Sequence, residues 1–173
     1  MNSDQRRKEI LDLLKNSTYP ISASALAGRL SVSRQIIVGD VALLRSSGEK
    51  IIATPRGYIF GSEQKGLIRQ IAVRHYPEEM EMELTVIVDQ GCSVLDVIVE
   101  HPLYGQLTGS LQLSSRYDVS QFIKRCREAD AQPLSRLTEG IHLHTLSCPD
   151  EDAYKRVVHN LKKLSFLLED TED

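Results

Sequence analysis

Residues 22–46 read SASALAGRLSVSRQIIVGDVALLRS, two helix-forming runs separated by a short polar break. Ser22 and Ser33 stand in the N-cap position of these runs, where a serine hydroxyl accepts a hydrogen bond from the first helical turn. The first run covers 23–30 and the second continues to about Ser46, with a stripe of apolar residues at helical spacing: Ile36, Ile37, Val41 and Leu44. Two helices joined tightly at 31–32 predict a helix-turn-helix.

The flanking segments extend this motif to a small domain. Upstream, residues 5–16 place apolar side chains on one face and charged ones on the other, which predicts another helix. Downstream, Gly48 ends the second run, and IIAT at 51–54 and GYIF at 57–60 predict two short strands joined by a turn. Three helices followed by a hairpin predict a winged helix-turn-helix.

The helix predicted from Ser33 to about Ser46 carries side chains suited to reading DNA. A helix-turn-helix places the N-terminal end of this helix in the major groove, and that end carries Ser33, Arg34 and Gln35. Arginine pairs bidentately with guanine and glutamine with adenine. Arg56, at the hairpin turn, is expected to meet phosphate or the minor groove. Further phosphate contacts are expected from Arg6, Arg7, Lys8 and Arg45. A protein-interaction module with solvated charges is the alternative.

Composition agrees with a nucleic-acid-binding module attached to a second domain. The chain has 173 residues, 41% hydrophobic and 26% charged, and no apolar run long enough for a membrane span. The N-terminus lacks the apolar region of a secretory signal. Residues 1–60 hold nine basic and five acidic residues, whereas the remainder holds twelve and nineteen. A basic segment joined to an acidic one suggests that only the first binds a polyanion.

A polar stretch, GSEQKG at 61–66, predicts a linker between a DNA-binding domain at 1–62 and a regulatory domain at 66–173. Beyond it, periodicity predicts strand, helix, strand, strand, helix, strand and a long extra helix. The strands are 67–75, 93–100, 106–113 and 141–146, and the helices are 77–91, 120–129 (capped by Asp118) and 150–168. This order is that of a ferredoxin-like β-α-β-β-α-β domain, so the protein is predicted to be α/β (α+β).

The predicted topology brings four metal-binding side chains together. The first and fourth strands are expected to be antiparallel neighbours, so His75, which ends the first, lies beside the start of the fourth. His142 and His144 are two residues apart there and share a face. Glu83 lies about two turns into the helix that covers the sheet. Three nitrogens and one oxygen predict a site for a divalent transition metal, Zn²⁺, Ni²⁺, Fe²⁺ or Mn²⁺. His159, alone on the last helix, is expected to be an ordinary surface residue.

The three cysteines, Cys92, Cys126 and Cys148, are odd in number, widely spaced and without a Cys-x-x-Cys pair. This pattern is not a disulfide framework. They are expected to be small buried apolar residues in a reducing, cytoplasmic protein.

Several stretches resemble known families. Ser33-Arg34-Gln35 opening a helix resembles the biotin-operon-repressor type of helix-turn-helix. Residues 74–75, VEHPLYG at 99–105 and GIHLHT at 140–145 closely resemble the 3H domain, named for its histidines. The pairing of both domains resembles the niacin-responsive transcription repressors of the NiaR family over almost the whole chain.

The resemblance implies a function. Members of this family repress genes of NAD synthesis or niacin uptake, with nicotinic acid as co-repressor. It implies a homodimer that binds a double-stranded DNA operator, and a 3H domain that binds the effector and a divalent transition metal. The family's ligands fall at His75, Glu83, His142 and His144, the four positions that the topology selects.

A hypothesis for effector binding follows. Nicotinate is a small aromatic carboxylate, so it is expected to bind beside the metal, either coordinating it or pairing its carboxylate with a nearby cation such as Arg74. His101 or Tyr104 is expected to hydrogen-bond to it. Binding is expected to shift the dimer toward a spacing of recognition helices that fits a palindrome.

Two alternatives remain. One is a regulator for which the metal itself is the signal. The other is a small metal-dependent hydrolase. The second is disfavoured because no nucleophile elbow, P-loop or dinucleotide fingerprint occurs in the sequence, so we do not expect an enzyme.

Overall fold

The computed structural model describes residues 1–61, 66–129 and 131–169. The chain divides after residue 63 into two compact units, each with its own apolar core. Both units contain helices and a sheet, which confirms the mixed α/β class. Most of the predicted linker lies outside the described residues. Within the described ranges, no helix has the length and apolar character needed to cross a bilayer.

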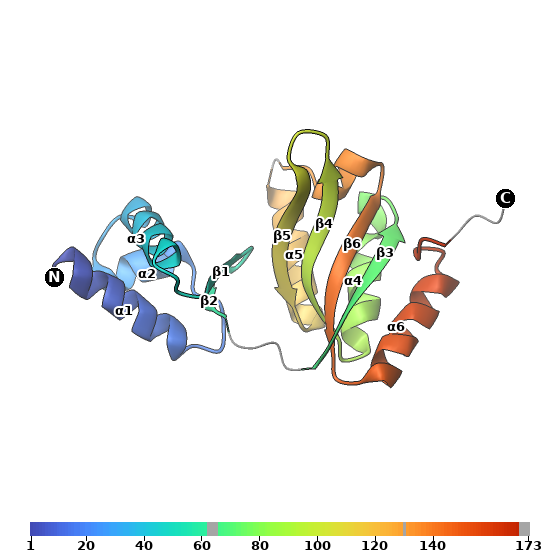
Figure 1. Ribbon diagram of the computed structural model, residues 1–173, viewed down its shortest axis with the longest axis horizontal. Helices are drawn as coiled ribbons and strands as arrows, with labels where there is room; N and C mark the ends of the chain where they lie inside the picture. The colour runs from blue at the N-terminus through green and yellow to red at the C-terminus, as the bar shows by residue number, and fades with distance from the viewer. Residues whose placement is uncertain (62–65, 130, 170–173) are drawn as a thin grey trace. The chain divides into compact units, whose positions relative to one another are not determined.

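The first unit contains the predicted three helices and hairpin (Figure 1). The elements are α1 (Ser3–Lys15), α2 (Ala23–Leu30), α3 (Arg34–Ser46), β1 (Ile51–Thr54) and β2 (Gly57–Phe60). The Ser22 hydroxyl accepts from the Ala25 N–H at 3.1 Å and the Ser33 hydroxyl from the Ile36 N–H at 3.3 Å, so both predicted caps are present. α1 begins earlier than expected because Asn2 caps it through the Gln5 N–H.

The hairpin is anchored to the helices by a short additional bridge. Ile21, between α1 and α2, exchanges two backbone hydrogen bonds with Tyr58, of 2.8 and 2.9 Å. This close approach requires glycine at position 57, because a Cβ there would lie 2.4 Å from the Ile21 carbonyl oxygen and φ is +134°. The bridge gives the wing a fixed position on the helices.

Two details of α3 and α1 differ from the expectation. Ile37 is fully buried, but Ile36 is 42% exposed and does not anchor the helix to the core. Arg6 and Arg7 both pair with the buried Asp40 carboxylate, at 2.5 and 3.4 Å. Their charge is therefore partly neutralised inside the domain, and their assignment as phosphate contacts stays a prediction.

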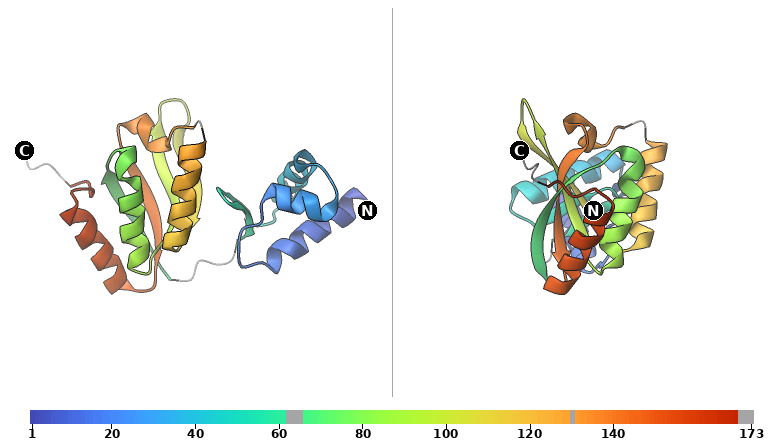
Figure 2. Two further views of the ribbon diagram at one scale, coloured as in Figure 1. Left: turned by 180° about the vertical axis from the view of Figure 1, so that it is seen from behind. Right: turned by 90° about the vertical axis from the view of Figure 1, so that its right-hand side faces the viewer.

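The second unit is a four-stranded antiparallel sheet with its helices packed on one face (Figures 1 and 2). Its elements are β3 (Leu67–Arg74), η1 (Pro77–Glu79), α4 (Met80–Asp89), β4 (Ser93–His101), β5 (Gly105–Leu113), α5 (Arg116–Glu128), η2 (Leu134–Thr138), β6 (Ile141–Cys148) and α6 (Glu151–Lys163). The core lies between the sheet and α4, α5 and α6.

The strand order is β3-β6-β4-β5. The predicted antiparallel pairing of the first and fourth strands is present. In each of the two strand-helix-strand connections, another strand lies between the two strands that the helix connects. The order nevertheless differs from the ferredoxin-like one, in which the first strand is central. Here β3 is at an edge, where its backbone bonds to the chain after α6: the Arg74 N–H donates to Phe166 and the Leu168 N–H to Ala72.

Two helix boundaries correct the sequence prediction. α5 starts at Arg116 because Ser115 is its cap, whereas Asp118 accepts from the Ser114 N–H. The last helix ends at Lys163 rather than 168, because Ser165 adopts a left-handed conformation at φ +59°. This turn directs Phe166 into the core, where it is 5% exposed.

The expectation for the cysteines is partly wrong. Cys92 and Cys148 are buried as predicted, but they form a disulfide that joins the start of β4 to the end of β6. The sequence spacing did not show it because the two residues are 56 apart and meet only through strand pairing. Cys126 is free.

Candidate functional site

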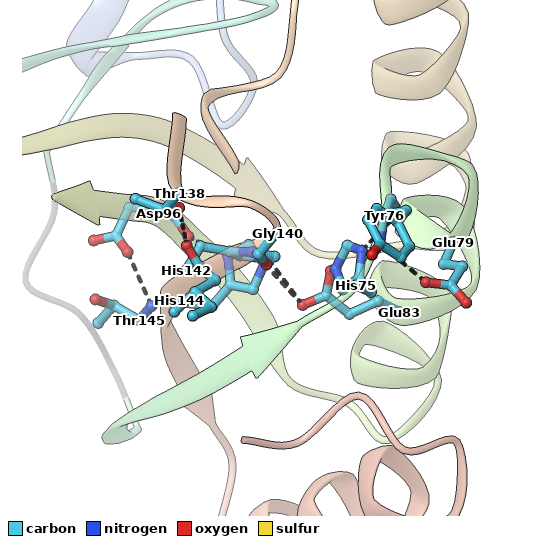
Figure 3. A network of polar contacts seen from close by, with 11 residues as sticks. His75, Tyr76, Glu79, Glu83, Asp96, Thr138, Gly140, His142, His144 and Thr145 are labelled. Atoms are coloured by element: carbon cyan, nitrogen blue, oxygen red, sulfur yellow. Dashed lines mark hydrogen bonds and ion pairs between the residues drawn. The ribbon is translucent and has the colours of Figure 1, made fainter. Parts of the chain in front are cut away.

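Four predicted side chains meet between the sheet and α4 (Figure 3). His142 and His144 face the core from β6, where they pair in register with Val73 and Ile71 of β3. His75 follows the last residue of β3, and Glu83 reaches the same place from α4. The histidines are 3–4% exposed and Glu83 is fully buried.

The backbone fixes the orientation of each imidazole. The Nδ1 atom of His75 lies 2.9 Å from the Tyr76 carbonyl oxygen, that of His142 2.8 Å from Gly140, and that of His144 2.7 Å from Asp96. Carbonyl oxygens only accept hydrogen bonds, so each Nδ1 carries the proton and donates it. Each Nε2 is consequently left with a lone pair, as in histidine ligands held by an outer shell of acceptors.

All three Nε2 atoms point to one carboxylate. His75 Nε2 contacts Glu83 Oε2 directly, and His142 and His144 lie 3.5 and 2.9 Å from Glu83 Oε1. Ligand atoms of His75, Glu83 and His142 all lie within 4.8 Å of one another, a spacing that one cation spans. His144 lies beside this group, because its Nε2 atom also approaches Glu83 Oε1.

Electrostatics keep Glu83 ionised. Burial raises the pKa of Glu83, but a positive charge on His144 and the hydrogen bonds that the imidazoles make once Nε2 is also protonated lower it further, so the net pKa is well below the usual range. Conversely, burial lowers the pKa of His75 and His144, and Glu83 raises both above the ordinary value. The site is a buried anion that attracts positive charge.

One observation tests whether these residues fit a metal. Glu83 Oε1 and His144 Nε2 are buried without a hydrogen-bond partner among the described residues, although they lie 2.9 Å apart. Two acceptor atoms facing each other repel unless a cation or a proton lies between them. Three imidazole nitrogens and one carboxylate oxygen suit Zn²⁺, Ni²⁺, Fe²⁺ or Mn²⁺. The residues therefore fit a divalent transition metal.

Gly140 holds the loop before β6 against the site. Its φ is +91°, and a Cβ at this position would lie 2.5 Å from the His75 carbonyl oxygen. The His75 N–H and the His142 Nδ1–H both donate to the Gly140 carbonyl. Sequence reasoning selected the histidines but missed Tyr76, Gly140 and Asp96 as their partners. The glycine two residues before His142 was the one available signal.

The three residues expected to bind an effector lie in two places. Arg74, at the end of β3, lines a cavity with residues of η1 and η2. His101 instead ends β4 and Tyr104 lies in the turn before β5, and neither lines this cavity. His101 Nδ1 accepts from the N–H groups of Leu103 and Tyr104 at 3.1 and 3.2 Å, so the ring closes the hairpin.

The residues expected to contact DNA are at the start of α3 and in the wing. Ser33, Arg34 and Gln35 are exposed, and Ile36 adds apolar surface beside them. The Ser33 hydroxyl is already used as the helix cap. Arg56 is half-buried at the β1–β2 turn and lines a cavity of about 720 Å³ with residues of α1 and α2.

Comparison with known protein families finds one match for each unit. The HTH domain family matches residues 6–59 and the 3H domain family residues 68–170. "Probable transcription repressor NiaR" of Thermotoga maritima is 45% identical over 166 residues, covering 96% of this chain and 95% of the relative. "Transcription repressor NadR" of Bacillus subtilis is 42% identical over 169 residues, covering 95% and 94%. An uncharacterized protein of Methanothermus fervidus is 24% identical over 140 residues, which is 22% of its length.

The two bacterial relatives are named as transcription repressors, and their similarity extends over both units. The resemblance seen in the sequence is thus confirmed, as is the prediction of a regulator rather than an enzyme. The chain belongs to the family of transcription repressors that includes NiaR and NadR, with an HTH domain followed by a 3H domain.

Proposed function

We propose that this repressor controls genes of NAD synthesis or niacin uptake, with nicotinic acid as co-repressor and a divalent transition metal in the 3H domain. The names of the two bacterial relatives support the regulatory part. The buried cluster of His75, Glu83, His142 and His144 supports the metal. As a transcription repressor it is proposed to act in the cytoplasm and not to associate with a membrane.

The observation that carries the proposal is the orientation of the three imidazoles. Their Nδ1 protons are donated to the backbone, and their Nε2 lone pairs converge on an ionised, buried carboxylate. When bound, the metal supplies a fixed positive charge that neutralises Glu83. The surrounding backbone carbonyls then hold the ligand residues in place, as outer-shell acceptors do in metal sites.

DNA recognition is assigned to the start of α3. Arg34 and Gln35 are exposed there and are proposed to read base edges, with Ser33 and Arg56 contacting the backbone. The repressor is proposed to act as a homodimer on a palindromic operator, because dimeric helix-turn-helix proteins read two half-sites about one helical turn apart. Nicotinic acid favours the state of the dimer whose spacing fits DNA.

Calorimetric titration tests the effector and the metal together. Nicotinic acid is titrated into the metal-loaded protein, and the titration is repeated after chelation. Binding that is lost on chelation supports the proposal. Absence of binding to either form would remove nicotinic acid as the effector and favour the alternative in which the metal is the signal.

Selection of DNA from a random pool tests the operator. The metal-loaded protein selects fragments with and without nicotinic acid, and the enriched sequences are compared. We expect an inverted repeat that is enriched only with nicotinic acid. Enrichment that depends on the metal but not on nicotinic acid would support the metal-sensing alternative.

A further inference from the structure

A cavity of about 380 Å³ lies beside the metal-ligand cluster. It is lined by Arg74, Tyr76, Pro77, Glu78, Ser135, Arg136, Glu139 and Gly140. These residues come from the end of β3, from η1 and from η2 with the turn that follows it. The volume is at the lower end of the range for small-molecule sites.

The two arginines of this cavity have no side-chain partner in the part of the chain that the structure describes. In the same unit, Arg69, Arg116 and Arg127 each pair with a carboxylate, and Arg156 bonds to a glutamine. Arg74, Arg136 and Arg125 make no such contact; Arg74 and Arg136 are exposed and line one cavity, whereas Arg125 lies outside it. Guanidinium groups of this kind bind carboxylates through paired, charge-assisted hydrogen bonds.

The cavity wall shares two residues with the support of the metal ligands. Tyr76 and Gly140 line the cavity, and their carbonyl oxygens accept the Nδ1 protons of His75 and His142. The imidazoles that turn Nε2 toward Glu83 therefore hold the cavity wall through Nδ1. A metal that fixes these rings fixes the wall as well.

We infer that Arg74 and Arg136 bind the carboxylate of a small aromatic monocarboxylic acid in this cavity, beside the metal and not on it. The inference rests on the proposed function, since nicotinate is such an acid. In this arrangement Arg136, rather than His101 or Tyr104, contacts the effector together with Arg74. The metal positions the cavity wall and does not bind the effector. Glu78 and Glu139 also line the cavity, so they repel a second negative charge and disfavour a dicarboxylate.

Calorimetry on variants of the full-length, metal-loaded protein tests the two arginines. R74Q and R136Q should each weaken nicotinate binding roughly ten- to hundredfold, the usual effect of losing a hydrogen bond to a charged group. R125Q is the matched control, because Arg125 is exposed on α5, has no side-chain partner among the described residues and lies outside the cavity. Metal content should be unchanged in all three. Nicotinamide and quinolinate should bind the wild-type protein more weakly than nicotinate.

Cobalt substitution tests the position of the ligand. The visible spectrum of Co²⁺ in the site reports its ligands, so nicotinate held by the arginines should leave the spectrum essentially unchanged. A change in the spectrum typical of a new ligand would place nicotinate on the metal and overturn the inference.

The outcomes separate this inference from the proposed function. If nicotinate binds the wild type and both arginine variants equally, the inference is wrong and the proposed effector stands. If nicotinate does not bind but benzoate does, and R74Q and R136Q lose benzoate, the cavity assignment holds and the proposed effector fails. If neither acid binds the metal-loaded wild type, both are wrong.

Discussion

His144 Nε2 lies 2.9 Å from Glu83 Oε1 with no hydrogen bond between them. The Nδ1 proton of His144 is donated to the Asp96 carbonyl, so the Nε2 lone pair faces a carboxylate lone pair inside the protein. Such an arrangement is unfavourable unless positive charge lies between the two atoms. The structure of the chain alone therefore requires a cation or an added proton at this place.

The first prediction concerns Glu83. E83Q should lower the affinity for Ni²⁺ or Zn²⁺ by more than about 100-fold, since loss of an outer-shell partner alone costs about 10- to 100-fold. E81Q is the control, because Glu81 is on the same helix but pairs with Arg127 at the surface. Metal titration with a competing chelator measures both. Equal affinities in the two variants would exclude Glu83 as a ligand.

Removal of the metal should destabilise one unit only. A ligand at about 1,000 times its Kd adds about 4 kcal/mol to the free energy of unfolding. Chelation should therefore lower the unfolding temperature of the 3H domain by several degrees and leave that of the winged helix unchanged. Differential scanning calorimetry of the whole chain measures both, with the winged-helix transition as internal control. A shift of both transitions would show that the metal acts elsewhere.

Asp40 should be a stability residue of the winged helix. It is 4% exposed and pairs with Arg6 and Arg7, so D40A leaves Arg6 without its carboxylate partner and Arg7 paired with Asp4 alone. We expect a loss of about 2–4 kcal/mol in urea unfolding. D12A, at an exposed position of α1, should stay within about 0.5 kcal/mol of the wild type. A neutral D40A would mean that the pair contributes nothing to folding.

Arg34 and Arg45 should separate base reading from phosphate contact. R34A should cost about 1–3 kcal/mol on the operator and relax its sequence preference. R45A should weaken binding to all sequences alike and reduce the salt slope by about one. Fluorescence anisotropy at several salt concentrations distinguishes the two. If R34A also weakened nicotinate binding, the division of tasks between the domains would be wrong.

The disulfide between Cys92 and Cys148 can be tested by counting the free thiols of the protein. Alkylation of the denatured, unreduced protein should modify Cys126 alone, and alkylation after reduction should modify all three cysteines. Mass spectrometry gives the number. C92S should lower stability by about 2–4 kcal/mol if the bond is present in solution. Three modified cysteines before reduction would contradict the bond.

The sequence was sufficient where short-range signals decide the structure. Ser22 and Ser33 set the starts of α2 and α3, and Gly57 fixes the turn of the wing. The His-x-His spacing placed two imidazoles on one face of β6, and the pairing of the first and last strands brought His75 to them. These inferences needed only periodicity and one topological rule.

Features that depend on long-range contacts were missed. The central position of β6, the left-handed turn at Ser165 and the disulfide all arise from packing between segments distant in the chain. The partners of the imidazoles are backbone carbonyls, which every residue has, so no residue type signals them. Arg136 comes from η2, a segment that the sequence did not predict as an element.

The segment after α6 has a consequence for association. A sheet has two edges, and each offers unpaired backbone groups to another strand. Phe166–Leu168 occupies part of the β3 edge, where it bonds to Ala72 and Arg74. Strand-to-strand growth of this sheet into a larger assembly is thereby hindered on one side. A second copy that joined by adding a strand would meet no such obstruction at β5, and β4 would then separate the shared edge from β6, which carries His142 and His144.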